Sequence, residues 1–423
     1  MKHNKRVIII GLDGVPFQML RDLSKKGIMP YTNEIISKGT FKQMFSSIPE
    51  ISSVAWSSII TGKNPGEHGI FGFVDLYPNS YKIKFPNFTD LKAPPFWDLI
   101  PAKSIIINVP ATYPVKKMNG VHISGFVSID IEKSVYPEEL IHKLKEFDYR
   151  LDVDSEKAHK SLDLFLEDLD KTLEAQIKSY RFLWDNYDWQ IFMLVFTGTD
   201  RLMHFLLDAY ENENNKYHRY FLTHFSKIDE IIGEINQHID KKEDILIILS
   251  DHGFERLEKN IYINSLLEEN GFLRFENNKK ILENISPFTK AFALDPARIY
   301  INFKDKYPSG SVNIQDKEKI LKDLESFFSS LIIDGKKVIK RIYRKEEIYK
   351  GPFMNKAADL ILLANPGFNL KANKSMENGI FTGKHTYNNA FYLINKVLKE
   401  DYFTEEFNVT NALNIKDYFK CLE

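Results

Sequence analysis

The feature that most constrains the fold is a set of short, β-branched apolar runs that end abruptly in polar or glycine-containing turns. The runs occupy residues 6–10, 104–107, 191–196, 245–249 and 360–363. Continuous apolar runs of this length are typical of strands buried on both faces of a parallel sheet. Between them, apolar residues recur at three- and four-residue spacing over 162–184 and 217–238, which predicts helices. This alternation favours an α/β fold with a doubly wound, mostly parallel sheet flanked by helices.

The segment from about 255 to 350 has a different character, with charged runs and a Lys/Glu-rich helical pattern near 316–331. We predict that 255–350 is an insertion or cap region, part of which could return to the core sheet. The catalytic core would then comprise 1–254 and 351–423, and the chain of 423 residues is long enough for both parts. A second, more polar excursion spans roughly 74–98.

Charge and cysteine content exclude several classes of function. The 57 Lys and Arg residues almost cancel the 58 Asp and Glu residues, so no bulk charge favours a nucleic acid polymer or an anionic membrane. The only cysteine is Cys421, which excludes an internal disulfide and a cysteine-rich metal site. The apolar run 7–10 is shorter than the roughly 7–15 residues of a signal-peptide core, and no stretch approaches the ~20 residues of a membrane span. We therefore expect a soluble cytoplasmic protein, whose oligomeric state the sequence does not indicate.

Polar side chains follow the predicted strands, where ligands bind in open α/β sheets. These residues are Asp13, Asp200 with His204, Asp251 with His252, and, beyond the last run, His385. Taken singly, each has an ordinary alternative as a turn residue, a helix cap or one of a solvated pair on a helix. Together, such groups would repel one another unless a cation joined them, so the set predicts divalent metal ions. Asp and His ligands without thiolates favour Zn²⁺, with Mn²⁺ or Fe as alternatives.

A candidate nucleophile lies in the segment 49–62. Residues 54–60 are compatible with a short helix, and Ser52 or Ser53 would occupy its N-cap region. A helix N-terminus offers unpaired N–H groups and a positive dipole end, which suit a serine alkoxide and a bound phosphate. The ordinary alternative is a serine that only caps the helix.

These motifs, taken in order, resemble the type I phosphodiesterase/nucleotide pyrophosphatase family of the alkaline phosphatase superfamily. The resemblance rests on Gly-Leu-Asp13-Gly, Ser52-Ser-Val-Ala-Trp-Ser-Ser-Ile-Ile-Thr61-Gly, Asn-Pro-Gly-Glu-His68-Gly, Thr-Asp200-Arg-Leu-Met-His204, Ser-Asp251-His252-Gly-Phe and Gly-Lys-His385. The motifs extend from position 13 to position 385, which is nearly the whole chain. The resemblance implies an alkaline-phosphatase-like fold with two metal ions.

The resemblance also implies a role for each matching residue. Asp13, Ser52, Asp251 and His252 match the ligands of one metal ion, and Asp200, His204 and His385 match the ligands of the other. Ser52 is preferred to Ser53 because it lies nine residues before Thr61, the offset at which the family places its nucleophile. Ser52 would attack the phosphorus atom and form a covalent phosphoserine. We interpret His68, in the turn after the nucleophile helix, as structural.

The expected activity is metal-dependent hydrolysis of a small-molecule phosphoric ester, with a phosphodiester or pyrophosphate as the preferred substrate. Ala55 stands where eukaryotic nucleotide pyrophosphatases have an Asn that contacts the phosphate, which argues against nucleotides. The alternatives are a phosphomonoesterase, a phosphonate hydrolase or a phosphomutase on the same core. A catalytically silent relative that binds a phospho-ligand or a glycan is the alternative from another class. A sulfatase is disfavoured because residues 52–56 lack the Pro and Arg of the sulfatase motif.

Overall fold

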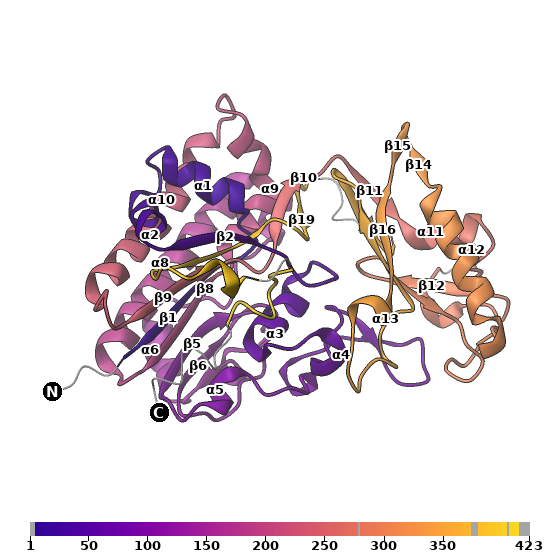
Figure 1. Ribbon diagram of the computed structural model, residues 1–423, viewed down its shortest axis with the longest axis horizontal. Helices are drawn as coiled ribbons and strands as arrows, with labels where there is room; N and C mark the ends of the chain where they lie inside the picture. The colour runs from indigo at the N-terminus through magenta and orange to yellow at the C-terminus, as the bar shows by residue number, and fades with distance from the viewer. Residues whose placement is uncertain (1–4, 278–279, 374–379, 404–405, 414–423) are drawn as a thin grey trace. The chain divides into compact units, whose positions relative to one another are not determined.

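The computed structural model describes residues 5–277, 280–373, 380–403 and 406–413 (Figure 1). Residues 1–4 of the N-terminal segment and Cys421 lie outside the described residues. The chain divides into two compact units: the first comprises Met1–Lys63, Asn87–Glu255 and Ile380–Glu423, and the second comprises Asn64–Pro86 and Arg256–Gly379. Among the described helices, none combines the length and apolar character needed to cross a membrane.

The first unit is built on an eight-stranded sheet with the order β2-β20-β9-β1-β8-β5-β6-β7. The strands are β1 (Val7–Leu12), β2 (Thr40–Met44), β5 (Ser104–Val109), β6 (Gly120–Ser124), β7 (Val135–Tyr136), β8 (Ile191–Phe196), β9 (Ile245–Leu249) and β20 (Ala390–Ile394). The five central strands, from β9 to β6, pair in parallel, whereas β2, β20 and β7 pair antiparallel to their neighbours. The predicted α/β class with a mostly parallel sheet is therefore confirmed.

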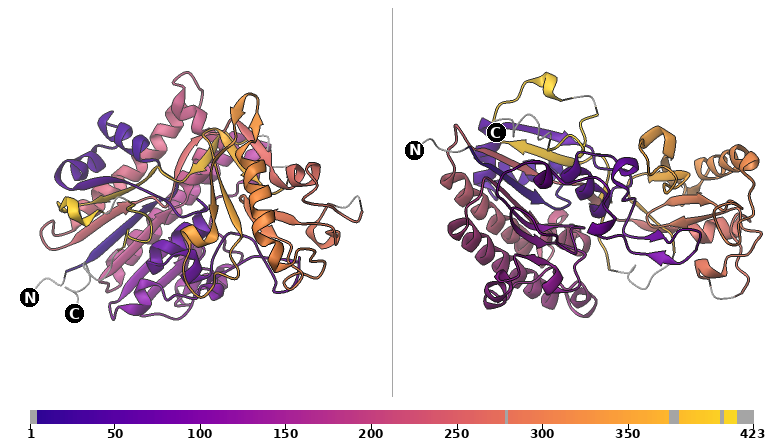
Figure 2. Two further views of the ribbon diagram at one scale, coloured as in Figure 1. Left: turned by 45° about the vertical axis from the view of Figure 1, so that its right-hand side comes forward. Right: turned by 90° about the horizontal axis from the view of Figure 1, so that it is seen from below.

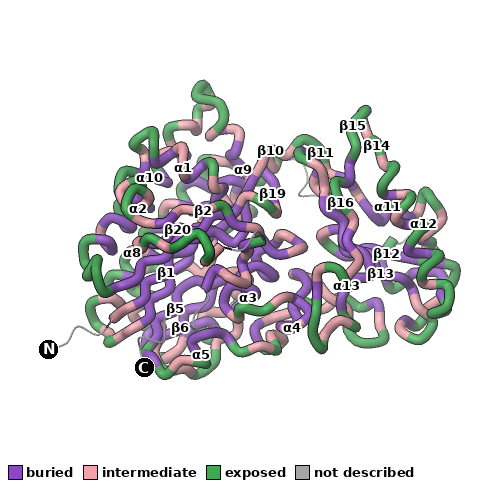
Figure 3. The backbone as a smooth tube through the Cα atoms, in the orientation of Figure 1, coloured by how far each residue is buried: buried purple, intermediate pink, exposed green. Residues whose placement is uncertain are grey.

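The central strands are apolar throughout because both of their faces are covered. Side chains alternate between the two faces of a strand, and in β1 Ile8 and Ile10 enter one core cluster while Val7 and Ile9 enter another. Figure 3 shows β1 and β5 buried along their length, as are β8 and β9. This double burial explains why the sequence pattern of these strands is continuous rather than alternating.

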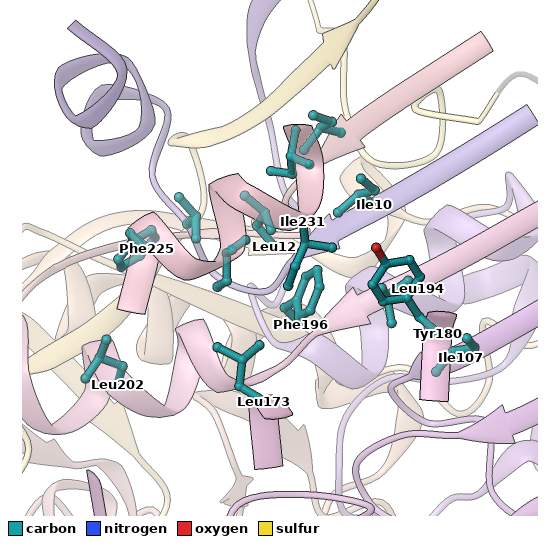
Figure 4. Packing of buried hydrophobic residues seen from close by; sticks show 14 of the residues in the cluster. Ile10, Leu12, Ile107, Leu173, Tyr180, Leu194, Phe196, Leu202, Phe225 and Ile231 are labelled. Atoms are coloured by element: carbon teal, nitrogen blue, oxygen red, sulfur yellow. The ribbon is translucent and has the colours of Figure 1, made fainter. Parts of the chain in front are cut away.

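One face of the sheet is covered by α1 (Phe17–Lys25), α2 (Pro30–Lys38), α6 (Leu140–Glu146), α8 (Leu162–Asn186), α9 (Gly198–Glu211) and α10 (His218–His238). Figure 4 shows apolar side chains of β1 and β8 against side chains of these helices: Ile10, Leu12, Leu194 and Phe196 against Leu173, Leu202, Phe225 and Ile231. The right-hand view of Figure 2 shows the magenta helices along one side of the sheet. The helices predicted over 162–184 and 217–238 are α8 and α10.

The other face is covered by α3 (Ser52–Thr61), α5 (Phe96–Leu99) and apolar residues of the segment 407–413. Trp56 of α3 is fully buried against β1. A side chain at Gly11 of β1 would place its Cβ 2.5 Å from Cη2 of Trp56, which is closer than non-bonded atoms approach. The glycine therefore allows the indole to lie directly on the strand.

The second unit contains a four-stranded antiparallel sheet with the order β12-β13-β17-β16. Its strands are β12 (Ala291–Leu294), β13 (Arg298–Ile301), β16 (Ile339–Arg344) and β17 (Leu360–Ala364). Its helices include α4 (Pro65–His68), α11 (Ile263–Glu269), α12 (Lys317–Ser329) and α13 (Lys345–Ile348). Its short strands form three pairs: β3 (Asp75–Leu76) with β4 (Ile83–Lys84), β11 (Lys259–Tyr262) with β18 (Phe368–Lys371), and β14 (Ile332–Ile333) with β15 (Lys336–Lys337). This unit thus has a sheet and helices of its own.

The expectation that the run 360–363 joins the parallel sheet is wrong. The run forms β17, which pairs antiparallel with β13 and β16 in the second unit. Burial makes β17 apolar, but an apolar run does not reveal its partners. The fifth parallel strand is instead β6, whose apolar run is interrupted by the buried His122. Because β17 pairs with β13 and β16, and β18 pairs with β11, residues 360–371 belong to the second unit.

Candidate metal centre

The structure places all seven predicted site residues in the first unit. Asp13 follows β1 directly, Asp251 and His252 follow β9 after one intervening residue, and Ser52 is the first residue of α3. Asp200 and His204 lie one turn apart in α9, which follows β8. His385 lies in β19 (Gly383–Thr386), which pairs with β10 (Gly253–Arg256). Two groups have ligand atoms close enough for a metal ion: Asp13 with Asp251 and His252, and Asp200 with His252 and His385.

The first group surrounds the hydroxyl of Ser52. Ser52 Oγ lies 3.2 Å from Nε2 of His252 and 3.5 Å from Oδ1 of Asp13. The same nitrogen of His252 lies 3.6 Å from Oδ1 of Asp13 and 3.4 Å from Oδ2 of Asp251. All four residues are buried, so these polar atoms have little access to bulk water.

The second group adjoins the first through the ring of His252. Nε2 of His385 lies 3.1 Å from Oδ1 of Asp200 and 3.0 Å from Nε2 of His204. The same oxygen of Asp200 lies 3.6 Å from Nε2 of His204 and 3.9 Å from Nε2 of His252. Oδ1 of Asp200 therefore faces three imidazole nitrogens.

The three histidines have the same hydrogen-bonding arrangement. Nδ1 lies 3.3 Å from the carbonyl oxygen of Gly383 in His204, 3.1 Å from that of Gly253 in His252 and 3.0 Å from that of Glu50 in His385. A carbonyl only accepts hydrogen bonds, so Nδ1 is the nitrogen that carries the proton. The neutral ring then presents a lone pair at Nε2, as metal-ligating histidines do.

The three carboxylates share a second arrangement, in which a nitrogen donor holds one oxygen and the other faces the histidines. The donors are Nε1 of Trp56 for Asp13 at 3.1 Å, the amide of Gly14 for Asp251 at 3.1 Å and Nη1 of Arg201 for Asp200 at 3.3 Å. On the facing side, Oδ1 of Asp200 and Oδ2 of Asp251 are buried and find no hydrogen-bond partner among the described residues. Buried acceptors in native proteins are normally satisfied, so these oxygens fit bonds to a cation.

Gly14 is needed for this arrangement for two reasons. Its φ of +73° lies in the left-handed region that favours glycine. A Cβ at this position would also lie 2.6 Å from the ring of Phe254 and 3.1 Å from Cε1 of His252. The Asp-Gly pair, which could have been an ordinary turn, thus brings the amide of residue 14 to the carboxylate of Asp251.

Burial and mutual repulsion shift the acidities of the carboxylates. Burial, reinforced by the charges of Asp251 and Asp200, raises the pKa of Asp13 well above its usual value. Burial raises the pKa of Asp251 to about 7. For Asp200, burial acts to raise the pKa, but in the metal-free site the positive charge of a protonated His204 or His385 and that of Arg201 would outweigh burial and lower the pKa. A divalent cation would reverse the repulsion, so the donor set fits metal binding.

Helix α9 is kinked where it carries His204. The backbone of Leu206 leaves the helical region, with φ −137° and ψ 28°. Thr382 inserts at this point: its amide donates to the carbonyl of His204, and its hydroxyl accepts from the amide of Leu207. Such an insertion into the helical hydrogen-bond ladder causes a kink. The kink thus joins α9 to the segment that leads into β19 and His385.

The start of α3 differs by one residue from the sequence expectation. Ile51, rather than a serine, is the N-cap residue, and no side chain caps the helix. Ser52 occupies the first helical position, and its hydroxyl faces Asp13 and His252. Ser53 is also buried, and its hydroxyl has no hydrogen-bond partner among the described residues.

Three residues of the site were not identified from the sequence: Trp56, Arg201 and Lys384. Nζ of Lys384 lies 3.0 Å from Oε1 of Glu255 and 3.3 Å from the carbonyl of His385. Arg201 and Lys384 adjoin predicted ligands in sequence, and Trp56 lies one helical turn after Ser52, so adjacency was the available signal. His68 belongs to the second unit, where its Nδ1 accepts from the amide of Ile70 and burial lowers its pKa to about 3.

Comparisons with known proteins give a family and a fold for the chain. Residues 7–388 match the family described as type I phosphodiesterase / nucleotide pyrophosphatase. A search of curated proteins finds no match. Among solved structures, the chain is similar to a phosphonoacetate hydrolase from Sinorhizobium meliloti 1021 in complex with phosphonoformate, with 16% identity, a TM-score of 0.64 and coverage of 99% of this chain and 95% of that chain. It is also similar to an inactive murine ectonucleotide pyrophosphatase / phosphodiesterase 5 in complex with AMP, with 14% identity, a TM-score of 0.55 and coverage of 98% and 95%.

Proposed function

The chain belongs to the type I phosphodiesterase/nucleotide pyrophosphatase family of the alkaline phosphatase superfamily, and we propose that it hydrolyses a phosphodiester with Ser52 as nucleophile at a two-metal centre. Membership makes it a phosphoric ester hydrolase; the nucleophile, the ions and the diester preference are the proposal. The observation that carries it is the position of Ser52 Oγ, which lies 3.2 Å from His252 and 3.5 Å from Asp13 at the start of α3.

The two groups of ligands would hold one ion each. Asp13, Ser52, Asp251 and His252 would hold the first ion, and Asp200, His204 and His385 the second. Bound divalent ions at such a site supply Lewis acidity for the attacking and leaving oxygens of an in-line displacement. We propose Zn²⁺, because the donors are carboxylates and imidazoles, with Mn²⁺ or Fe as alternatives.

The reaction would proceed through a covalent phosphoserine. Ser52 Oγ forms a bond to phosphorus while the bond from phosphorus to the leaving oxygen breaks, and water then hydrolyses the phosphoserine and restores the hydroxyl. Ser52 is the first residue of α3, so amides of the first helical turn can donate to the phosphoryl oxygens.

The charges beside the site support a singly charged phosphodiester rather than a doubly charged monoester. Two nearby cations already have carboxylate partners: Arg201 contacts Asp152 and Asp200, and Lys384 contacts Glu255. A second phosphoryl charge would call for a further cation. Ala55, a buried residue of α3, supplies no side-chain amide for the phosphate, which supports a substrate other than a nucleotide. The cytoplasmic location and the interpretation of 255–350 as an inserted cap stay predictions from the sequence.

The test compares Ser52→Ala with Ser53→Ala, a matched substitution at the adjacent buried serine. With added zinc or manganese, bis-p-nitrophenyl phosphate should be hydrolysed by the unchanged protein and by Ser53→Ala, whereas Ser52→Ala should lose at least about 10⁴-fold in turnover. Mass spectrometry of acid-quenched protein should locate phosphate on Ser52. Full activity of Ser52→Ala would contradict the nucleophile.

The same assay with p-nitrophenyl phosphate and with phosphonoacetate tests the substrate class. We expect the diester to be the best of the three substrates. Faster hydrolysis of the monoester would indicate a phosphomonoesterase, and faster hydrolysis of the phosphonate would indicate a phosphonate hydrolase. No turnover of any of the three by protein with both ions bound would favour a binding protein.

A further inference from the structure

Arg201 is the only charged group among the three donors that hold the carboxylates of the metal centre. Its Nη1 lies 3.3 Å from Oδ2 of Asp200. Its Nε and Nη2 lie 3.2 and 2.7 Å from Oδ2 of Asp152. The carbon of the guanidinium lies 4.1 Å from the ring centroid of Phe126, within the range of a cation–π contact. The guanidinium is therefore held by the segments after α6 and β6 as well as by its own helix.

Asp152 links this arrangement to the start of α9. Its Oδ1 accepts a hydrogen bond of 3.4 Å from the hydroxyl of Thr197, the residue before α9, while its Oδ2 binds Arg201. A carboxylate that contacts the guanidinium on one side and the helix start on the other restricts how Arg201 can rotate. The planar fork of arginine then points a fixed N–H at Asp200.

This ion pair is less exposed than the pair that Arg181 forms in the same unit. Arg181 of α8 also makes a forked contact with a carboxylate, Glu234 of α10, at 2.7 to 3.1 Å. The side chain of Arg181 is 55% exposed, whereas that of Arg201 is 15% exposed. Exposed pairs contribute little to stability. Arg201 is thus a partly buried, oriented cation beside a ligand group.

We propose that Arg201 is a positioning residue for Asp200: by holding Oδ2, it directs Oδ1 toward Nε2 of His204 and Nε2 of His385. Asp152 and Phe126 hold the guanidinium in this orientation. The proposal rests on the proposed function, because it assigns Asp200, His204 and His385 to the second metal ion.

The sign of one measurement separates positioning from simple electrostatics. A cation next to a metal site repels the metal ion, so if charge alone mattered, removal of Arg201 would tighten metal binding. If Arg201 orients a ligand, its removal weakens binding instead. Loss of a residue that orients a metal ligand typically costs about 10- to 100-fold in metal affinity.

The experiment measures zinc affinity of metal-free protein by competition with a chelator, with zinc alone as the probe. Arg201→Met should weaken one of two binding steps about 10- to 100-fold, and Arg201→Lys, which keeps the charge but not the fork, should remain weakened. Arg181→Met is the matched control and should leave both steps unchanged. In a His204→Ala background, adding Arg201→Met should leave the binding step of the first ion unchanged, because both residues act on the second ion.

The outcomes separate this inference from the proposed function. Unchanged or tighter binding in folded Arg201→Met, or full recovery by Arg201→Lys, would overturn the positioning role while leaving the two-metal proposal intact. Failure of the unchanged protein to bind two ions would overturn the two-metal proposal itself. If circular dichroism shows that Arg201→Met does not fold, Asp152→Asn replaces it. This variant releases the guanidinium and should weaken the same zinc-binding step several-fold. An unchanged step would overturn the inference.

Discussion

The two ligand groups of the first unit use the same chemistry in different surroundings. Asp13, Asp251 and His252 lie within three residues of strand ends and have side chains that are 0 to 3% exposed. In the second group, the side chains of His204 and His385 are 20% and 16% exposed, and their positions depend on the kinked α9 and on β19. The positions of the first group are therefore determined by the ends of sheet strands, whereas the second group is assembled from a kinked helix and from β19, and its histidines are more exposed.

The donors behind the carboxylates differ in the same way. Neutral groups, the indole of Trp56 and the amide of Gly14, hold Asp13 and Asp251, while the charged Arg201 holds Asp200. A buried charge without a partner is costly, so the first group should tolerate loss of a ligand poorly. The partly exposed second group can recruit water in place of a missing side chain. The predictions below test this difference.

Among the histidine and carboxylate ligands, the largest effect is expected for His252→Ala. His252 is fully buried and faces Asp13 and Asp251 at 3.6 and 3.4 Å, so its loss leaves a cavity lined by carboxylates. We expect the first ion to be lost and turnover of bis-p-nitrophenyl phosphate to fall about 10⁴-fold, which corresponds to about 5.5 kcal/mol of activation free energy. Elemental analysis should find one ion per chain. Retention of both ions would contradict the assignment of His252.

The next prediction concerns the pH dependence of stability in the metal-free protein. The pKa of Asp251 is raised from 3.8 to about 7, so the folded state keeps a proton that the unfolded chain releases above about pH 4. This contribution to stability is present below pH 4 and is lost as the pH rises through about 7. An asparagine side chain at this position cannot ionise, and its carbonyl can still accept from the amide of Gly14. Asp251→Asn should therefore be more stable than the unchanged protein above pH 7, by up to about 4 kcal/mol.

Urea unfolding of both proteins between pH 4 and 8 measures this difference. Buried histidines such as His122 and His224, whose pKa values burial lowers to about 3 and about 4, titrate in the same range. They are common to both proteins and cancel in the difference. A stability difference that does not change with pH would show that the first group is not strained by charge.

A smaller effect is expected for His204→Ala in the second group. His204 is partly exposed, so water can take the place of its Nε2, while Asp200 and His385 remain 3.1 Å apart. We expect weaker binding of the second ion, unchanged binding of the first, and a loss of turnover of about 10²-fold, or about 2.7 kcal/mol. Added zinc should recover part of the activity in His204→Ala but not in His252→Ala. Equal behaviour of the two variants would remove the distinction between the groups.

The sequence predicted the parts of the fold that depend on burial rather than on partners. The strands β1, β5, β8 and β9 are apolar because both of their faces are covered, and the resulting apolar runs can be recognised in the sequence. The same pattern led to a wrong prediction for β17, since an apolar run does not indicate whether its neighbouring strands are parallel or antiparallel. Strand β6 was missed because the buried His122 interrupts it.

The site shows the same limit. Asp13 and Asp251 could be proposed because a polar residue directly after a buried strand lies at the ligand-binding edge of a parallel sheet. The donors Trp56 and Arg201 could not, because their role depends on which carboxylate oxygen each one meets. That contact follows from Gly11 lying under the indole and from Asp152 reaching α9 from a distant segment. The ligand roles themselves stay predictions.

The smallest effect is expected for Trp56→Phe, which removes a neutral donor of the first group and keeps an aromatic ring. Nε1 of Trp56 donates to Oδ2 of Asp13 at 3.1 Å. Without it, the first ion should bind about tenfold more weakly, and the free energy of unfolding should fall by about 1–3 kcal/mol because a buried acceptor loses its partner.

Trp97→Phe is the matched control, because Trp97 is buried in the same core cluster and packs against Phe88, Phe96 and His122 rather than against the metal centre. It should change stability but leave the affinity of both ions unchanged. Equal losses of zinc affinity in the two tryptophan variants would mean that core packing, and not the indole N–H, sets the position of Asp13. A loss confined to Trp56→Phe and to the first ion would show that a neutral donor positions its carboxylate as Arg201 is proposed to position Asp200.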